Sequence, residues 1–192
     1  MKNASDEPSL LVLGTVERFR SLGHRATKDH VQLFGRVPHI APRAWLHAVP
    51  PGLNDAELAD LVRRVGRPFR PEYLKFLRAM NGVKLFCGAL CLYGARPAMA
   101  GRGIDAAFLP FDLVDPNGVE RPRRLEEQLL VIGGYREDGS LITLDFASGE
   151  VSRCSRETEA RFLAWPSFGD FVREELARLD RIHDEQGRAI AP

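Results

Sequence analysis

The residues of this chain that could act as nucleophiles or soft metal ligands are three cysteines and five histidines. Cys87 and Cys91 are spaced to face the same side of a strand. Neither belongs to a Cys-x-x-Cys pair, and no His-x-x-x-His motif accompanies them, so the spacing of a metal site is missing. We therefore expect small buried thiols, no metal and no cofactor.

The sequence also lacks the motifs of a catalytic serine and of a phosphate-binding loop. Ser140 ends an Asp-Gly-Ser run that is typical of a hairpin turn, and it lacks the Gly-x-Ser-x-Gly elbow of a nucleophile. The Gly-Gly pair at 133–134 precedes a turn, whereas a phosphate loop needs a helix N-terminus after its glycines. We do not expect an enzyme. A deep pocket holding a cysteine beside a histidine would restore that alternative.

Carboxylates remain as candidates for binding. Asp138 and Asp145 flank one predicted strand. Each has a simple alternative role: Asp138 can form a turn, and the Asp145 carboxylate can cap the turn at 148–149. The last predicted helix is acidic as well. The candidate protein-binding residues are the carboxylates at the strand ends and on that helix: Asp138, Asp145, Glu150, Glu174 and Glu175.

Composition limits the class of partner. The 192 residues suit one domain, or one domain with an extension. The 27 basic and 26 acidic side chains give a net charge of +1, which argues against a dedicated nucleic-acid binder. The longest early apolar run spans only 10–13, against the roughly 20 residues that cross a bilayer. With few cysteines, this predicts a cytoplasmic protein without membrane partners.

Charge is nevertheless unevenly distributed. Residues 60–78 carry six basic and two acidic side chains, a net +4, and 170–185 carry six acidic side chains and three arginines, a net −3. These segments are either solvated helix faces or a docking surface that offers both signs of charge.

Local signals predict helices on both sides of a group of strands. Asn54 and Glu57 resemble a capping box, and Gly66 ends that helix. A second helix starts at Pro71 and stops at Asn81-Gly82, and a last helix starts at Ser167. Strands are predicted at 83–86, 89–93, 129–133, 141–146 and 151–154, with tight turns between the last three.

This order predicts an α+β fold with a mostly antiparallel sheet and helices packed around it. Residues 1–50 form an N-terminal extension, expected to pack on the core, with a helix at 10–20 and a strand at 31–34. The domain spans 51–182, and 183–192 are expected to be a flexible tail. Residues 112–124 are a polar and mobile connector.

Residues 53–180 resemble the SUKH superfamily, and within it the Smi/Knr group. The pieces that carry the resemblance are 53–66, 69–77, Asn81-Gly82, 131–133, 138–145, 148–151 and 165–171. One departure is Phe69-Arg70-Pro71, where the family usually has Leu-Pro. The resemblance implies an α+β fold with a mixed sheet, no catalytic residues, and a protein partner.

Bacterial members of that family are mostly immunity proteins. The resemblance thus implies a protein that neutralises a cognate toxin of a polymorphic, contact-dependent or type VI secretion system by occluding its active site. If that toxin is a nuclease, its basic active site should meet an acidic face. A regulatory or scaffold protein of the same fold, with a non-toxin partner, stays open as the alternative.

Overall fold

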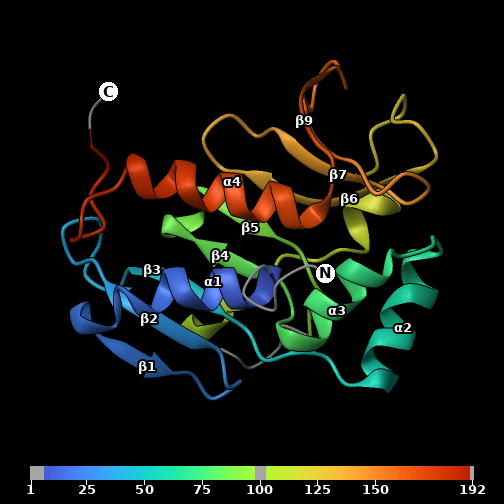
Figure 1. The fold of residues 1–192 in the computed structure, drawn as a ribbon. Coiled ribbons are helices and arrows are strands. Elements are labelled where there is room, and N and C mark those ends of the chain that lie inside the picture. Colours follow the sequence, from blue (N-terminus) through green and yellow to red (C-terminus); the bar gives the residue numbers. More distant parts are fainter. Residues whose placement is uncertain (1–6, 98–102, 191–192) are drawn as a thin grey trace.

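The computed structural model describes residues 7–97 and 103–190 (Figure 1). Within them, one sheet has its strands in chain order and every neighbouring pair antiparallel. The strands are β1 His24–Ala26, β2 Gln32–Arg36, β3 Trp45–Val49, β4 Val83–Leu85, β5 Leu90–Leu92, β6 Leu129–Tyr135, β7 Leu141–Asp145, β8 Val151–Cys154 and β9 Arg161–Trp165. The helices are α1 Pro8–Glu17, α2 Asp55–Val65, α3 Pro71–Ala79 and α4 Phe168–Arg181. The predicted α+β class is confirmed.

Helices α1, α3 and α4 pack on one face of this sheet, and α1 lies beside α4 (Figure 1). Aromatic rings fill the contact between α3 and α4: the ring centroids of Tyr73 and Phe168 lie 5.3 Å apart, and those of Phe76 and Phe168 lie 5.2 Å apart. These rings are buried together with the inward-facing leucines of β4 and β5. Burial of this apolar area is the main source of stability.

The helix ends follow the predicted caps. Asn54 and Glu57 form a full capping box, and Gly66 ends α2 in the left-handed conformation. The Ser167 side chain accepts a hydrogen bond from the backbone N–H of Asp170 and so caps α4. None of the helices in the described residues is long and apolar enough to cross a bilayer.

The first fifty residues extend the same sheet. The predicted N-terminal helix is α1, and the predicted strand is β2. Strands β1 and β3 were not predicted. They pair with β2 on either side, and Ala48 of β3 lies opposite Lys84 of β4, which joins this segment to the rest of the sheet. Residues 1–6 lie outside the described part.

One expectation about loops differs from the structure. The connector at 112–124 is anchored, because the buried Asn117 side chain accepts from the Val131 N–H at 2.8 Å and donates to the Val131 carbonyl at 2.7 Å. Within the segment 183–192 that we expect to be a flexible tail, the Asp184 carboxylate accepts the N–H groups of Gln186 and Arg188, each at 2.8 Å, and so forms a tight turn. Residues 191–192 lie outside the described part.

Candidate protein-binding surface

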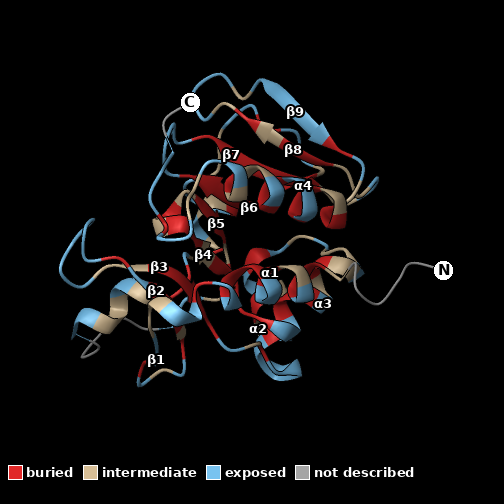
Figure 2. Ribbon diagram, turned by 60° about the vertical axis from the view of Figure 1, so that its left-hand side comes forward, coloured by how far each residue is buried: buried red, intermediate tan, exposed pale blue. Residues whose placement is uncertain are grey.

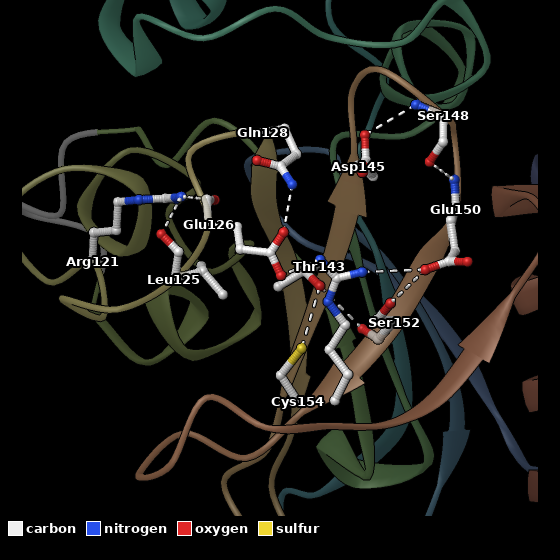
Figure 3. A network of polar contacts seen from close by, with 11 residues as sticks. Arg121, Leu125, Glu126, Gln128, Thr143, Asp145, Ser148, Glu150, Ser152 and Cys154 are labelled. Atoms are coloured by element: carbon white, nitrogen blue, oxygen red, sulfur yellow. Dashed lines mark hydrogen bonds and ion pairs between the residues drawn. The ribbon is translucent and has the colours of Figure 1, made fainter.

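The turn between β7 and β8 is built by Asp145. Its carboxylate accepts the backbone N–H of Ser148 at 3.0 Å (Figure 3). It also accepts the N–H of Ala147 at 2.7 Å. The Ser148 hydroxyl in turn accepts the N–H of Glu150 at 3.2 Å. These bonds satisfy the turn backbone and fix the direction in which Glu150 leaves it.

Arg161, the first residue of β9, joins two carboxylates that are distant in sequence. Its Nη2 atom lies 2.6 Å from Glu126 Oε1, and its Nη1 atom lies 3.3 Å from Glu150 Oε1. Gln128 also donates to Glu126 (Figure 3). Two carboxylates thus contact the Arg161 guanidinium, and Asp145 adjoins them because its backbone N–H bonds the Glu150 carbonyl at 2.8 Å. The side chains of these four residues have a net charge of −2. We call Glu126, Asp145, Glu150 and Arg161 the acidic cluster.

Basic residues border the acidic cluster. Arg70 donates to the Ala147 carbonyl at 3.3 Å, and Arg121 donates to the Glu126 carbonyl at 2.7 Å. The surface therefore presents both signs of charge, and its side chains are already held by intramolecular bonds. Such ordering lowers the entropy that a binding event would cost.

Strand β9 also bears exposed apolar side chains, and Leu163 lies on the other face of the sheet from Arg161, because their partners Arg153 and Cys154 are consecutive residues of β8. Phe162 is 52% exposed and Leu163 is 47% exposed, and β9 is an edge strand of the sheet (Figure 2). The Arg153 guanidinium lies 5.3 Å from the centre of the Phe162 ring. An apolar pair bordered by charged groups has the arrangement of an interface, with an apolar centre and a polar rim.

Asp138 lies at the other end of β7. Its carboxylate accepts the Ser140 N–H at 2.9 Å and the Ser140 hydroxyl at 2.7 Å, and it pairs with Arg153 at 2.7 Å. Desolvation opposes ionisation of Asp138, but these hydrogen bonds and the guanidinium charge outweigh it, so its pKa lies below the usual value. Arg153 therefore contacts both Asp138 and the Phe162 ring of β9.

The two candidates on α4 differ in exposure. Glu174 is exposed and accepts the indole N–H of Trp165 at 3.0 Å. Glu175 is only 3% exposed and pairs with Arg178 at 2.9 Å. The structure brings Asp145 and Glu150 into one cluster, places Asp138 and Glu174 beside β9, and keeps Glu175 inside the protein.

The thiols show no sign of activation. Cys87 and Cys91 line a cavity of about 640 Å³ that no histidine lines within the described residues. Burial raises the pKa of the Cys91 thiol to about 11 and raises that of Cys87 as well, so both stay protonated near neutral pH. In the same residues, no group of three His, Cys, Asp or Glu side chains could hold a metal.

Sequence reasoning missed Arg161, Glu126 and Phe162. Phe162 and Leu163 are adjacent rather than alternating, so β9 lacks the period of two that marks a half-buried strand. Arg161 and Glu126 are 35 residues apart, and only the sheet brings them together. The many arginines of this chain gave no local signal to single out this one.

Comparison with known proteins places this surface in a family. The model of the SMI1/KNR4 family (SUKH-1) matches residues 52–174, which run from just before α2 into α4 and include the whole acidic cluster. No curated protein matches the chain. The match covers more than half of the 192 residues. The chain therefore belongs to the SMI1/KNR4 family (SUKH-1).

Proposed function

We propose that this chain is a non-catalytic, cytoplasmic protein-binding module, and specifically a bacterial immunity protein that binds and neutralises a cognate toxin. Membership of the SMI1/KNR4 family supports the general class. The observation that carries the proposal is that the edge strand β9 bears Arg161 of the acidic cluster on one face and the exposed Leu163 on the other, with the exposed Phe162 between them in sequence. A partner that covers this edge would meet charged groups and apolar side chains together.

The physics of association favours this surface. Phe162 is the natural anchor, because aromatic side chains near the centre of an interface contribute most of its binding energy. The net −2 of the acidic cluster would steer a basic partner surface, such as the active site of a nuclease, toward β9. Occlusion of that active site would then neutralise the toxin without chemistry by this chain.

The candidate carboxylates take different parts in this proposal. Glu150 and Asp145 lie in the acidic cluster, and Asp138 and Glu174 lie near β9 through Arg153 and Trp165. Glu175 contributes indirectly, by holding Arg178. We expect the first four to contact the partner or its solvent layer, and Glu175 to support the fold.

The test is co-expression with the product of the adjacent gene in the native locus, followed by co-purification and a growth-rescue assay. A stable complex together with rescued growth supports toxin neutralisation. Rescue without a complex would contradict occlusion. A complex with a cellular protein, and no rescue, would favour the regulatory or scaffold alternative.

A further inference from the structure

The sheet has a hollow on the face away from the helices. Leu90 and Leu92 belong to the helix-covered core, so Cys91 between them points to the opposite face. On that face, residues paired across β3 to β6 form one row: Ala48, Lys84, Cys91 and Gly134. Three of the four are small, and this leaves a depression in the middle of the sheet.

The segment 103–111 and neighbouring rings turn the depression into a cavity of about 640 Å³. Its lining includes Trp45, Tyr93, Phe108 and Phe111, besides the protonated thiols of Cys87 and Cys91. Small-molecule sites have volumes of roughly 300–1,000 Å³ and mostly apolar walls with a few polar groups. The size fits a whole small molecule better than the single side chain of a docking partner.

The charges of the cavity are one-sided. Lys84 and Arg136 line it, and no Asp or Glu does within the described residues. Arg136 donates to the Cys87 carbonyl at 3.4 Å. The Lys84 ammonium has three donors, one of which bonds the Ala107 carbonyl at 2.8 Å, and it lies 4.3 Å from the centre of the Phe111 ring.

Lys84 is unusual for its position. It is half-buried in the centre of a sheet face, and its ammonium contacts the Ala107 carbonyl and the Phe111 ring, with no ion pair to a carboxylate among the described residues. Desolvation lowers its pKa, so its ammonium would gain from a nearby anion. Buried charges in proteins are ordinarily paired. An anion with an apolar body would suit both the Lys84 ammonium and the apolar walls of the cavity.

We propose that this cavity binds a small carboxylic acid with an apolar aliphatic or aromatic body, whose carboxylate bonds Lys84 with Arg136 at the rim. The body would lie over Cys91 and Gly134 between the aromatic walls. This site lies on residues other than the acidic cluster and β9, so it does not depend on toxin binding.

Tryptophan fluorescence gives a direct test. The chain has two tryptophans, and only Trp45 lines the cavity, so a Trp165→Phe variant leaves Trp45 as the reporter. Decanoate and cyclohexanecarboxylate are the probes, and decanamide is the neutral match. We expect a saturable change in Trp45 fluorescence with at least one of the two acids. Decanamide should bind about tenfold or more weakly than that acid, and the Lys84→Met variant should bind the acid about tenfold or more weakly than the parent. Lys84→Arg should keep most of the affinity.

Lys75→Met is the matched control, because Lys75 is an exposed lysine on α3 outside the cavity. It should bind the acids as the parent does, and thermal unfolding checks that each variant folds. Absence of saturation with both acids would overturn the proposal, as would equal binding by Lys84→Met. Loss of partner-protein binding in Lys84→Met, with neither acid bound, would assign the cavity to a protein segment instead.

Discussion

The carboxylate of Glu72 on α3 accepts a hydrogen bond of 3.1 Å from the backbone N–H of Gly169, 97 residues later, in the first turn of α4. The first turn of a helix has unpaired N–H groups and a partial positive charge, and both favour a carboxylate there. This contact ties the second helix of the family-matched region to its last helix.

Glu72→Ala should therefore lower the free energy of unfolding by about 1 kcal/mol, because one N–H of α4 loses its acceptor. Glu72→Gln keeps an oxygen acceptor and should lose less. Urea denaturation measures both values. An unchanged urea midpoint for Glu72→Ala would show that water replaces the carboxylate without cost.

The buried His47 should make stability depend on pH. Its Nδ1 atom accepts from the Phe86 N–H, and desolvation, with smaller effects of His183 and Arg18, lowers its pKa from 6.5 to about 3. Below pH 6.5 the unfolded chain binds a proton that the folded chain does not. This stabilisation is thus complete above pH 6.5 and falls as pH drops toward 3, by at most about 1.4 kcal/mol per pH unit.

The check is urea denaturation between pH 7 and pH 5 for the parent, His47→Gln and the exposed control His39→Gln. His47→Gln should be less stable than the parent at pH 7 and should depend less steeply on pH. The stability of His39→Gln should change with pH as steeply as that of the parent. Equal slopes for all three proteins would contradict a neutral buried His47.

Two glycines with similar positive φ angles should respond differently to substitution by alanine. Gly66 has a φ of 66° and open space where a Cβ would stand, whereas Gly82 has a φ of 72° and its Cβ would lie 2.6 Å from the Leu92 carbonyl oxygen. Gly66→Ala should cost about 1 kcal/mol, the strain of the left-handed region. Gly82→Ala adds a backbone clash and should unfold at clearly lower temperature. Equal melting temperatures of Gly66→Ala and Gly82→Ala would contradict the close contact between position 82 and the Leu92 carbonyl.

Asn117 should matter more than its place in a polar connector suggests. Its side chain makes hydrogen bonds with both backbone groups of Val131 and donates to the Leu113 carbonyl at 2.9 Å. Asn117→Ala leaves these buried groups unpaired and should cost about 2–3 kcal/mol in a denaturant titration. Asn117→Asp keeps the acceptor for Val131 N–H but loses two donors, so it should not restore stability. A loss below 0.5 kcal/mol, as is usual at surface positions, would contradict this role.

The sequence predicts those parts of the fold that local chemistry determines. The capping box at Asn54 and the cap at Ser167 place α2 and α4, and the turns at 137–140 and 147–150 place β6 to β8. Strands β1, β3 and β9 lack such signals, because their pairing depends on contacts between distant segments.

Some residues of the candidate surface can likewise be predicted from local sequence, and others cannot. Asp145 and Glu150 could be selected from the sequence because they flank a recognisable turn. Their partner Arg161 could not, since its position opposite Glu126 and Glu150 exists only after the sheet forms. Glu175 lies on an acidic helix, so its sequence context predicts an exposed side chain. It is buried instead, because α4 packs against the sheet on that side.

The exposed phenylalanine on β9 gives the most direct test of the proposed binding surface. Phe162→Asp places a charge where we expect the apolar centre of the interface, so affinity for the adjacent-gene product should fall by about tenfold or more. Ile40→Asp replaces another exposed apolar side chain, 53% exposed and distant from β9 in the sheet order, and serves as the matched control.

The decisive measurement is titration calorimetry of the parent and these two variants with that partner, after thermal unfolding has shown that all three fold. We expect tight binding by the parent and by Ile40→Asp, and weak binding by Phe162→Asp. Equal affinity for Phe162→Asp and the parent would contradict the assignment of β9 and the acidic cluster as the binding surface.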